Sequence, residues 1–179
     1  MDLSIGGNVF GRDESIKPNL DDVRGRYNDE DIVTGVRDTG GRVSLAIFEC
    51  KKPVIGAING AAVGIGATMT LGMDIRMVSE KARIGFVFGK IGVTPEACST
   101  WFLPRIVGMQ TALEWVYSAD ILNASQVVDA GLARSAHAPE ELLPAARELA
   151  LKFVANRSPV AIALARQMMY RNSAMPSPR

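Results

Sequence analysis

The chain has 179 residues, 47% of them hydrophobic, and its 20 basic and 19 acidic residues leave a formal net charge of +1. This length and composition predict one globular domain and exclude a disordered, charged tail. A nearly neutral chain also lacks the basic field that attracts nucleic acid. Two cysteines exclude a dense disulfide framework, and no secretory pattern follows Met1, so we expect a soluble protein of a reducing compartment: cytoplasm, mitochondrion or peroxisome.

The first 42 residues differ in composition from the rest of the chain. They carry nine acidic and six basic residues, and glycines interrupt every short hydrophobic run. This pattern predicts a mobile loop, within which only residues 31–36 could begin regular structure. A helix is expected over 43–48, leading into a strand that follows Pro53.

The longest uncharged stretch runs from Pro53 to Met73, and its 21 residues could cross a bilayer. Five glycines, a proline, an asparagine and two threonines make its transfer into lipid unfavourable. We therefore favour a buried strand over 54–58, a glycine-rich turn, and a helix of small residues over 63–72.

Short strands and then helices are expected in the rest of the chain. Alternating residues predict strands over 74–78 and 82–86, joined by a turn at 79–81. Helices are then expected over 95–107, 109–118, 125–130, 142–154 and, with Ser158 as N-cap, 159–170. We divide the chain into a core of residues 1–135, with 1–42 as its mobile loop region, and a C-terminal helical region of residues 136–179.

Several chemistries lack the residues that they require. A dinucleotide-binding fingerprint from Gly64 would need glycine or alanine at position 69, where methionine stands. The P-loop, the GxSxG elbow and the HExxH motif do not occur in the sequence. His137, the one histidine, is expected to be a solvated loop residue rather than a base. With Cys50 and Cys98 it gives no recognisable ligand spacing, so no metal site is expected.

Two segments could carry chemistry. Residues 59–67 lead from the predicted strand into a helix, whose first N–H groups could hold a phosphate or a developing oxyanion. Alternatively, the glycines of this segment could simply allow the helix to pack closely against the strand. In residues 94–100, Thr94 is expected to cap a helix with Glu96 in its first turn. A carboxylate at that position can simply favour the helix dipole, so on the residues alone both roles of Glu96 stay open.

The chain contains KKPVIGAINGAAVGIGATMTLGMDIRMVSEKARIGF, then GKIGVTPEACSTWFLPRIVG and later DAGLA. In order and spacing these segments resemble the enoyl-CoA hydratase/isomerase family, also called the crotonase superfamily. The resemblance extends from Met1 to about Tyr170, and it implies an α/β fold, the ClpP/crotonase spiral of ββα turns that forms two near-perpendicular sheets surrounded by helices. It also implies homotrimers or hexamers. Family members begin earlier and continue further, so we expect a chain truncated at the N-terminus and at the C-terminus.

The resemblance implies a reaction on an acyl-CoA thioester. In the family, two backbone N–H groups hold the thioester oxygen while a carboxylate moves protons at the adjacent carbons. Ile65 matches the middle of the family's Gly-Gly-Gly and would supply one N–H; the other comes from an alanine that would precede Met1. The two glutamates of hydratases match Thr68 and Phe88, which cannot act as bases.

Glu96 matches the acid of isomerase members, so the resemblance implies an enoyl-CoA isomerase. Glu96 would take a proton from C2 of a 3-enoyl-CoA and return it at C4, and apolar neighbours would raise its pKa. The implied substrate-binding residues are Asp2, Leu3, Ala62, Val63, Gly64, Phe88 and Pro95. No cofactor is expected, because coenzyme A is part of the substrate, and neither nucleic acid nor a membrane span is expected. Two alternatives remain: a hydratase-type lyase, and a truncated crotonase-like protein that binds acyl-CoA or partner subunits without turnover.

Overall fold

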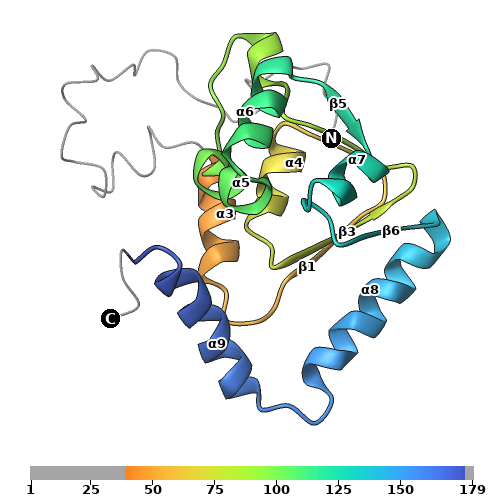
Figure 1. Cartoon of the computed structure of the whole chain (residues 1–179). Helices are drawn as coiled ribbons and strands as arrows, with labels where there is room; N and C mark the ends of the chain where they lie inside the picture. Colours follow the sequence, from red (N-terminus) through yellow and green to blue (C-terminus); the bar gives the residue numbers. More distant parts are fainter. Residues whose placement is uncertain (1–38, 176–179) are drawn as a thin grey trace.

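Two small sheets form the centre of the structure, a computed structural model that describes residues 39–175. In the first sheet, β1 (Ile55–Ile58), β3 (Ile75–Ser79) and β6 (Ser135–His137) are parallel and lie in the order β1-β3-β6. In the second, β4 (Arg83–Gly85) lies between β2 (Ala61–Val63), parallel to it, and β5 (Ile121–Asn123), antiparallel to it. Helices pack around the sheets (Figure 1).

The chain contributes one strand to each sheet before it forms a helix. After β1, residues 59–60 lead to β2 and then to helix α4 (Ile65–Leu71). After β3, residues 80–82 lead to β4 and then to the 3-10 helix η2 (Val87–Ile91). The first strands of the two turns pair with each other, and so do the second strands. This repeat is the ββα spiral that the sequence predicted.

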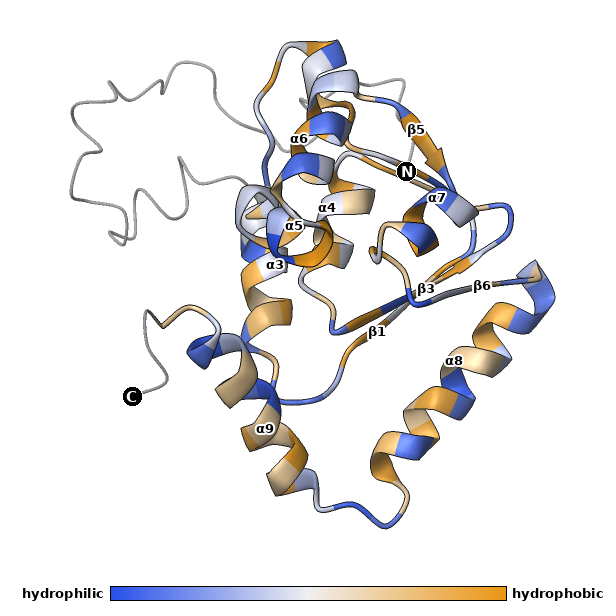
Figure 2. Ribbon diagram, viewed as in Figure 1, coloured by the Kyte–Doolittle hydropathy of each residue, from blue (hydrophilic) through white to orange (hydrophobic). Residues whose placement is uncertain are grey.

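Six further helices lie within residues 39–175, and two of them have side-chain caps at their N-termini. The six are α3 (Thr39–Glu49), α5 (Ser99–Val107), α6 (Met109–Ser118), α7 (Ala124–Asp129), α8 (Pro139–Val154) and α9 (Pro159–Asn172). Asn123 and Gln126 form a reciprocal capping box at α7, and the predicted cap Ser158 accepts a hydrogen bond from the N–H of Ala161 at α9. Helices α8 and α9 form a V (Figure 1), and hydrophobic residues recur along both (Figure 2).

The main hydrophobic core holds α4 against the second sheet and the helices α5 and α6. Ala67 and Leu71 of α4 are fully buried, and Phe86 stacks on Trp115 with ring centroids 6.1 Å apart. Burying a large apolar side chain stabilises a fold by roughly 1.5–3 kcal/mol, so this packing fixes the position of α4. The same packing therefore fixes the residues at the start of α4.

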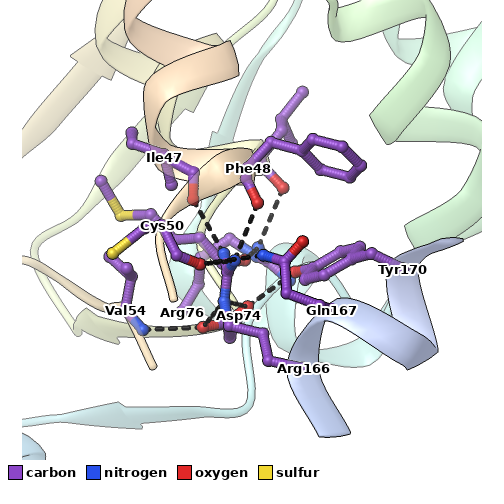
Figure 3. A network of polar contacts seen from close by, with 11 residues as sticks. Ile47, Phe48, Cys50, Val54, Asp74, Arg76, Arg166, Gln167 and Tyr170 are labelled. Carbon is purple, nitrogen blue, oxygen red and sulfur yellow. Dashed lines mark hydrogen bonds and ion pairs between the residues drawn. The ribbon is translucent and has the colours of Figure 1, made fainter. Parts of the chain in front are cut away.

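A buried arginine attaches α9 to the body of the protein (Figure 3). Arg166 pairs with Asp74, its Nε lying 2.9 Å from Oδ2, and Asp74 also accepts a hydrogen bond from the N–H of Val54. The Arg166 guanidinium donates as well to carbonyl groups at the C-terminal end of α3, those of Ile47, Phe48 and Cys50. One side chain thus connects α9, the C-terminal end of α3 and the residue that precedes β3.

Tyr170 adds a pH-dependent contact to this cluster. Burial, together with the hydrogen bond that its hydroxyl donates to Asp74 Oδ1 at 2.8 Å, raises the pKa of Tyr170 from 10.0 to about 12. The unfolded chain loses this proton near pH 10, so the stabilisation is complete below pH 10 and is lost as the pH rises through 12. We expect the free energy of unfolding to fall more steeply between pH 10 and 12 in the wild type than in Tyr170→Phe. Urea denaturation across this range measures both slopes, and equal slopes would contradict the assignment.

The predicted helix over 95–107 begins later than expected. Ala97 and Cys98 adopt left-handed conformations, with φ of 56° and 59°, so α5 starts only at Ser99. Thr94 is therefore not the cap of this helix, and Glu96 does not lie in its first turn. The helix-dipole explanation of Glu96 is wrong for that reason.

Of the very short strands, β4 lies within the strand predicted over 82–86, but three others were missed. β2, β5 and β6 have three residues each, too few for an alternating pattern to be visible, and the glycine-rich turn predicted before α4 contains β2. His137 lies in β6, paired with Ser79, and not in a solvated loop as predicted. β6 also spans the boundary drawn between residues 135 and 136, because it completes the first sheet.

Helix α3 begins at Thr39, so residues 39–42 are helical and not part of a loop. The rest of the 1–42 region, including residues 31–36, lies outside the described residues. The uncharged stretch 53–73 forms β1, β2 and α4, close to the favoured interpretation. Within residues 39–175, no helix combines the length and hydrophobicity needed to cross a bilayer.

Candidate active site

Glu96 lies immediately before the left-handed turn that starts α5, and its side chain is half-buried. A non-glycine residue in the left-handed region costs on the order of 1–3 kcal/mol. Two such residues in succession, Ala97 and Cys98, are tolerated where the surrounding structure fixes them, and such strain is concentrated at functional sites. From this position before α5, the Glu96 carboxylate reaches α4.

Thr68 contacts this carboxylate directly. Its hydroxyl donates a hydrogen bond to Glu96 Oε1 over 2.8 Å, although the two residues are 28 positions apart in the sequence. Thr68 has no solvent-exposed surface. The position that the family resemblance matches to a hydratase glutamate therefore holds a hydroxyl group that is bonded to Glu96.

Ile65 is the first residue of α4, and the chain reaches it through Gly64, whose φ of +56° suits glycine. The N–H of Gly64 is bonded to the carbonyl of Gly85, which ties the start of the helix to β4. The N–H of Ile65 has no acceptor within its own helix, and no hydrogen bond between described residues uses it. It lies at the N-terminal, positive end of α4.

Gly40 shows that Glu96 and Ile65 lie close together. A Cβ built on Gly40 would lie 2.4 Å from Glu96 Oε2 and 2.4 Å from Ile65 Cδ1. The N-terminal turn of α3 therefore packs against both residues, and a side chain at position 40 would displace the ends of the Glu96 and Ile65 side chains. Glu96, Thr68 and Ile65 thus form one site, between the starts of α3 and α4 and the turn before α5.

The other predicted substrate-binding residues have different surroundings. Ala62 and Phe88 are buried members of the main core, with 6% and 4% of their surface exposed. Val63, Gly64 and Pro95 are half-buried. Asp2 and Leu3 lie outside the described residues.

Sequence reasoning missed Thr68 and Gly40 as parts of the site. Thr68 was considered only as a residue that cannot act as a base, although its match to a hydratase glutamate could have indicated that it faces Glu96. Gly40 carries no comparable signal, because its role depends on which helix packs beside it. Within residues 39–175, no group of three or more His, Cys, Asp or Glu residues could hold a metal ion.

The spiral of ββα turns, with a half-buried carboxylate bonded to a threonine of a glycine-preceded helix, defines a protein of the crotonase fold. The chain belongs to the enoyl-CoA hydratase/isomerase family, whose profile matches residues 21–179. An enoyl-CoA hydratase of Alternaria alternata is 40% identical over 141 residues, which are 78% of this chain and 48% of that protein. The chain spans about half the length of the curated relatives it matches.

Solved structures give the same result for the fold. The enoyl-CoA hydratase/isomerase of Cupriavidus metallidurans CH34 superposes with a TM-score of 0.72 and 32% identity, over 76% of this chain and 51% of that chain. A monofunctional enoyl CoA isomerase from M. smegmatis superposes with a TM-score of 0.72 and 25% identity, over 79% of this chain and 66% of that chain. The crotonase-like α/β fold is therefore confirmed. Similarity extends to proteins named hydratases and to one named an isomerase.

Proposed function

We propose that this protein is an enoyl-CoA isomerase of fatty-acid metabolism, which converts a 3-enoyl-CoA into a 2-enoyl-CoA through Glu96. One observation carries the proposal. Of the two positions that match hydratase glutamates, Thr68 is a hydroxyl donor bonded to Glu96, and Phe88 is a phenyl group in the core. Neither can activate a water molecule, whereas Glu96 alone is sufficient to carry one proton between two carbons.

The proposed reaction moves a proton and a double bond within the acyl group. The Glu96 carboxylate takes a proton from C2, and the electron pair of that C–H bond spreads through the C3–C4 double bond and onto the thioester oxygen as a dienolate. The N–H of Ile65 donates to that oxygen while it carries negative charge. Glu96 then gives its proton to C4, and the double bond lies between C2 and C3.

The proposed partners follow from this reaction and from the family. The substrate is an acyl-CoA thioester, no separate cofactor takes part in the proton transfer, and we propose assembly as a homotrimer or hexamer. Hydration is the second candidate, because the Alternaria alternata relative and its counterpart in Clostridium acetobutylicum are named enoyl-CoA hydratases. Binding of acyl-CoA without turnover is the third.

Paired assays of the purified protein separate these candidates. We expect a 3-enoyl-CoA to be converted into its conjugated 2-enoyl isomer, followed by ultraviolet absorbance, and a 2-enoyl-CoA to remain unhydrated. A kcat/KM for hydration that equals or exceeds that for isomerisation would establish the hydratase instead. If calorimetry detects tight binding of acyl-CoA but neither reaction occurs, the protein binds acyl-CoA without turnover.

Gly40→Ala provides a test of the packing around the carboxylate. In an ordinary helix this change stabilises by about 1 kcal/mol, but here the new methyl group would collide with Glu96 and Ile65. Because a displacement of about 1 Å can cost on the order of a hundredfold in rate, we expect kcat for isomerisation to fall roughly tenfold to a hundredfold. Gly60→Ala is the matched control, since a Cβ on Gly60 meets nothing within 4 Å. Similar kcat values for the two variants would show that α3 does not constrain the site.

A further inference from the structure

Two buried threonines on helix α4 use their hydroxyl groups differently. The hydroxyl of Thr70 donates to the carbonyl of Ala67 within its own helix at 2.7 Å, which is the usual contact of a threonine inside a helix. The hydroxyl of Thr68 instead reaches a different segment and lies 2.8 Å from Glu96 Oε1. Its own helix offers it only longer contacts, 3.3 Å to the carbonyl of Gly64 and 3.5 Å to that of Ile65.

The choice between these acceptors follows from charge and burial. A threonine hydroxyl has one proton to donate, so it can serve one acceptor well at a time. A hydrogen bond to an ionised carboxylate is about twice as strong as one to a neutral carbonyl, and the distances agree with that preference. Because Thr68 has no exposed surface, water cannot replace the contact from the side of Thr68.

We propose that Thr68 is a positioning residue for Glu96. Its hydroxyl fixes the orientation of the carboxylate through Oε1 and stabilises the ionised form that accepts the substrate's proton. This inference rests on the proposed function for its effect on the reaction, but the contact itself does not depend on which reaction the site performs. Thr68 acts only through Glu96, since a side chain with no exposed surface cannot touch the acyl-CoA.

The role predicts a particular pattern in the kinetics. Without the hydroxyl, the carboxylate loses the contact that orients it through Oε1, so the fraction of complexes with the correct geometry falls and kcat falls with it. KM should change little, because no contact with the substrate is lost. The ionised carboxylate also loses a donor, so the acidic limb of the pH–rate profile should move to higher pH.

The experiment compares Thr68→Val, Thr68→Ser and Thr70→Val in the full chain. We expect Thr68→Val, which keeps the side-chain shape, to lower kcat roughly tenfold to a hundredfold, the range for one hydrogen bond to a charged group, and to shift the acidic limb upward. Thr68→Ser, which restores the hydroxyl, should recover most of kcat and return the limb to its wild-type position. Thr70→Val removes a buried hydroxyl from the same helix and should leave both kcat and the position of the acidic limb unchanged. This control separates positioning of Glu96 from a general effect on α4.

A second measurement separates failure of this inference from failure of the proposed function. The Glu96 carboxyl is titrated by NMR in protein labelled with ¹³C at glutamate, with the Glu96→Gln spectrum identifying its resonance. If the wild type isomerises, but Thr68→Val changes neither kcat nor the titration midpoint, the positioning role is wrong and the isomerase proposal stands. If the wild type does not isomerise, but Thr68→Val raises the midpoint, the reaction proposed is wrong and the positioning role stands. If the wild type does not isomerise and Thr68→Val leaves the titration midpoint unchanged, both the isomerase proposal and the positioning role are wrong.

Discussion

Glu96→Gln should lower kcat for the conversion of a 3-enoyl-CoA by roughly 10²–10⁴-fold, the usual contribution of a general acid–base group. Glutamine has nearly the shape of glutamate, but its amide cannot take a proton from C2. Its carbonyl oxygen can still accept the hydrogen bond from Thr68, so the local structure should be retained. The loss therefore reports on proton transfer and not on packing.

A binding measurement and a control variant test whether the loss is specific to proton transfer by Glu96. The dissociation constant for acyl-CoA, measured by calorimetry, should stay within a few-fold of the wild-type value, because the change affects the reacting carbons only. Glu80→Gln is the control, since Glu80 is an exposed carboxylate in the turn between β3 and β4, and it should retain wild-type kcat. Equal rates for wild type and Glu96→Gln would remove Glu96 from the mechanism.

Arg166→Met should lower the free energy of unfolding by roughly 3–5 kcal/mol, the cost of removing one partner of a buried ion pair. Methionine fills similar space but leaves the Asp74 carboxylate without its hydrogen-bonded ion-pair partner. It also leaves the carbonyls at the end of α3 without the donor that now connects them to α9 (Figure 3). The effect is large because charge and main-chain contacts are lost together.

Urea denaturation followed by circular dichroism measures this loss. Arg157→Met is the control, because Arg157 is exposed and, among residues 39–175, donates to nearby carbonyls of the loop between α8 and α9. Exposed contacts of this kind contribute little, so the control should change stability by less than about 0.5 kcal/mol. If Arg166→Met is as stable as the control, the cluster does not hold α9 in place.

The helices with strong local signals were predicted closely. α6 has the predicted bounds, α9 begins after its predicted serine cap, and α7 is within a residue of the prediction at each end. Three of the four three-residue strands, β2, β5 and β6, were missed because pairing with strands distant in sequence defines them, and so few residues show no period of their own. The fourth, β4, lies within the strand predicted over 82–86. The start of α5 was misplaced because propensity does not predict consecutive left-handed residues such as Ala97 and Cys98.

For the candidate site, the sequence by itself determined the family, through the order and spacing of its motifs, and identified Glu96 and Ile65 as residues to examine. Only the tertiary structure decided that Glu96 precedes its helix, that Thr68 bonds to it, and that Gly40 packs against it. The reason is physical. A motif consists of residues that are close together in the sequence, so it can be found in the sequence alone. The orientation of one carboxylate instead depends on packing between segments that are tens of residues apart.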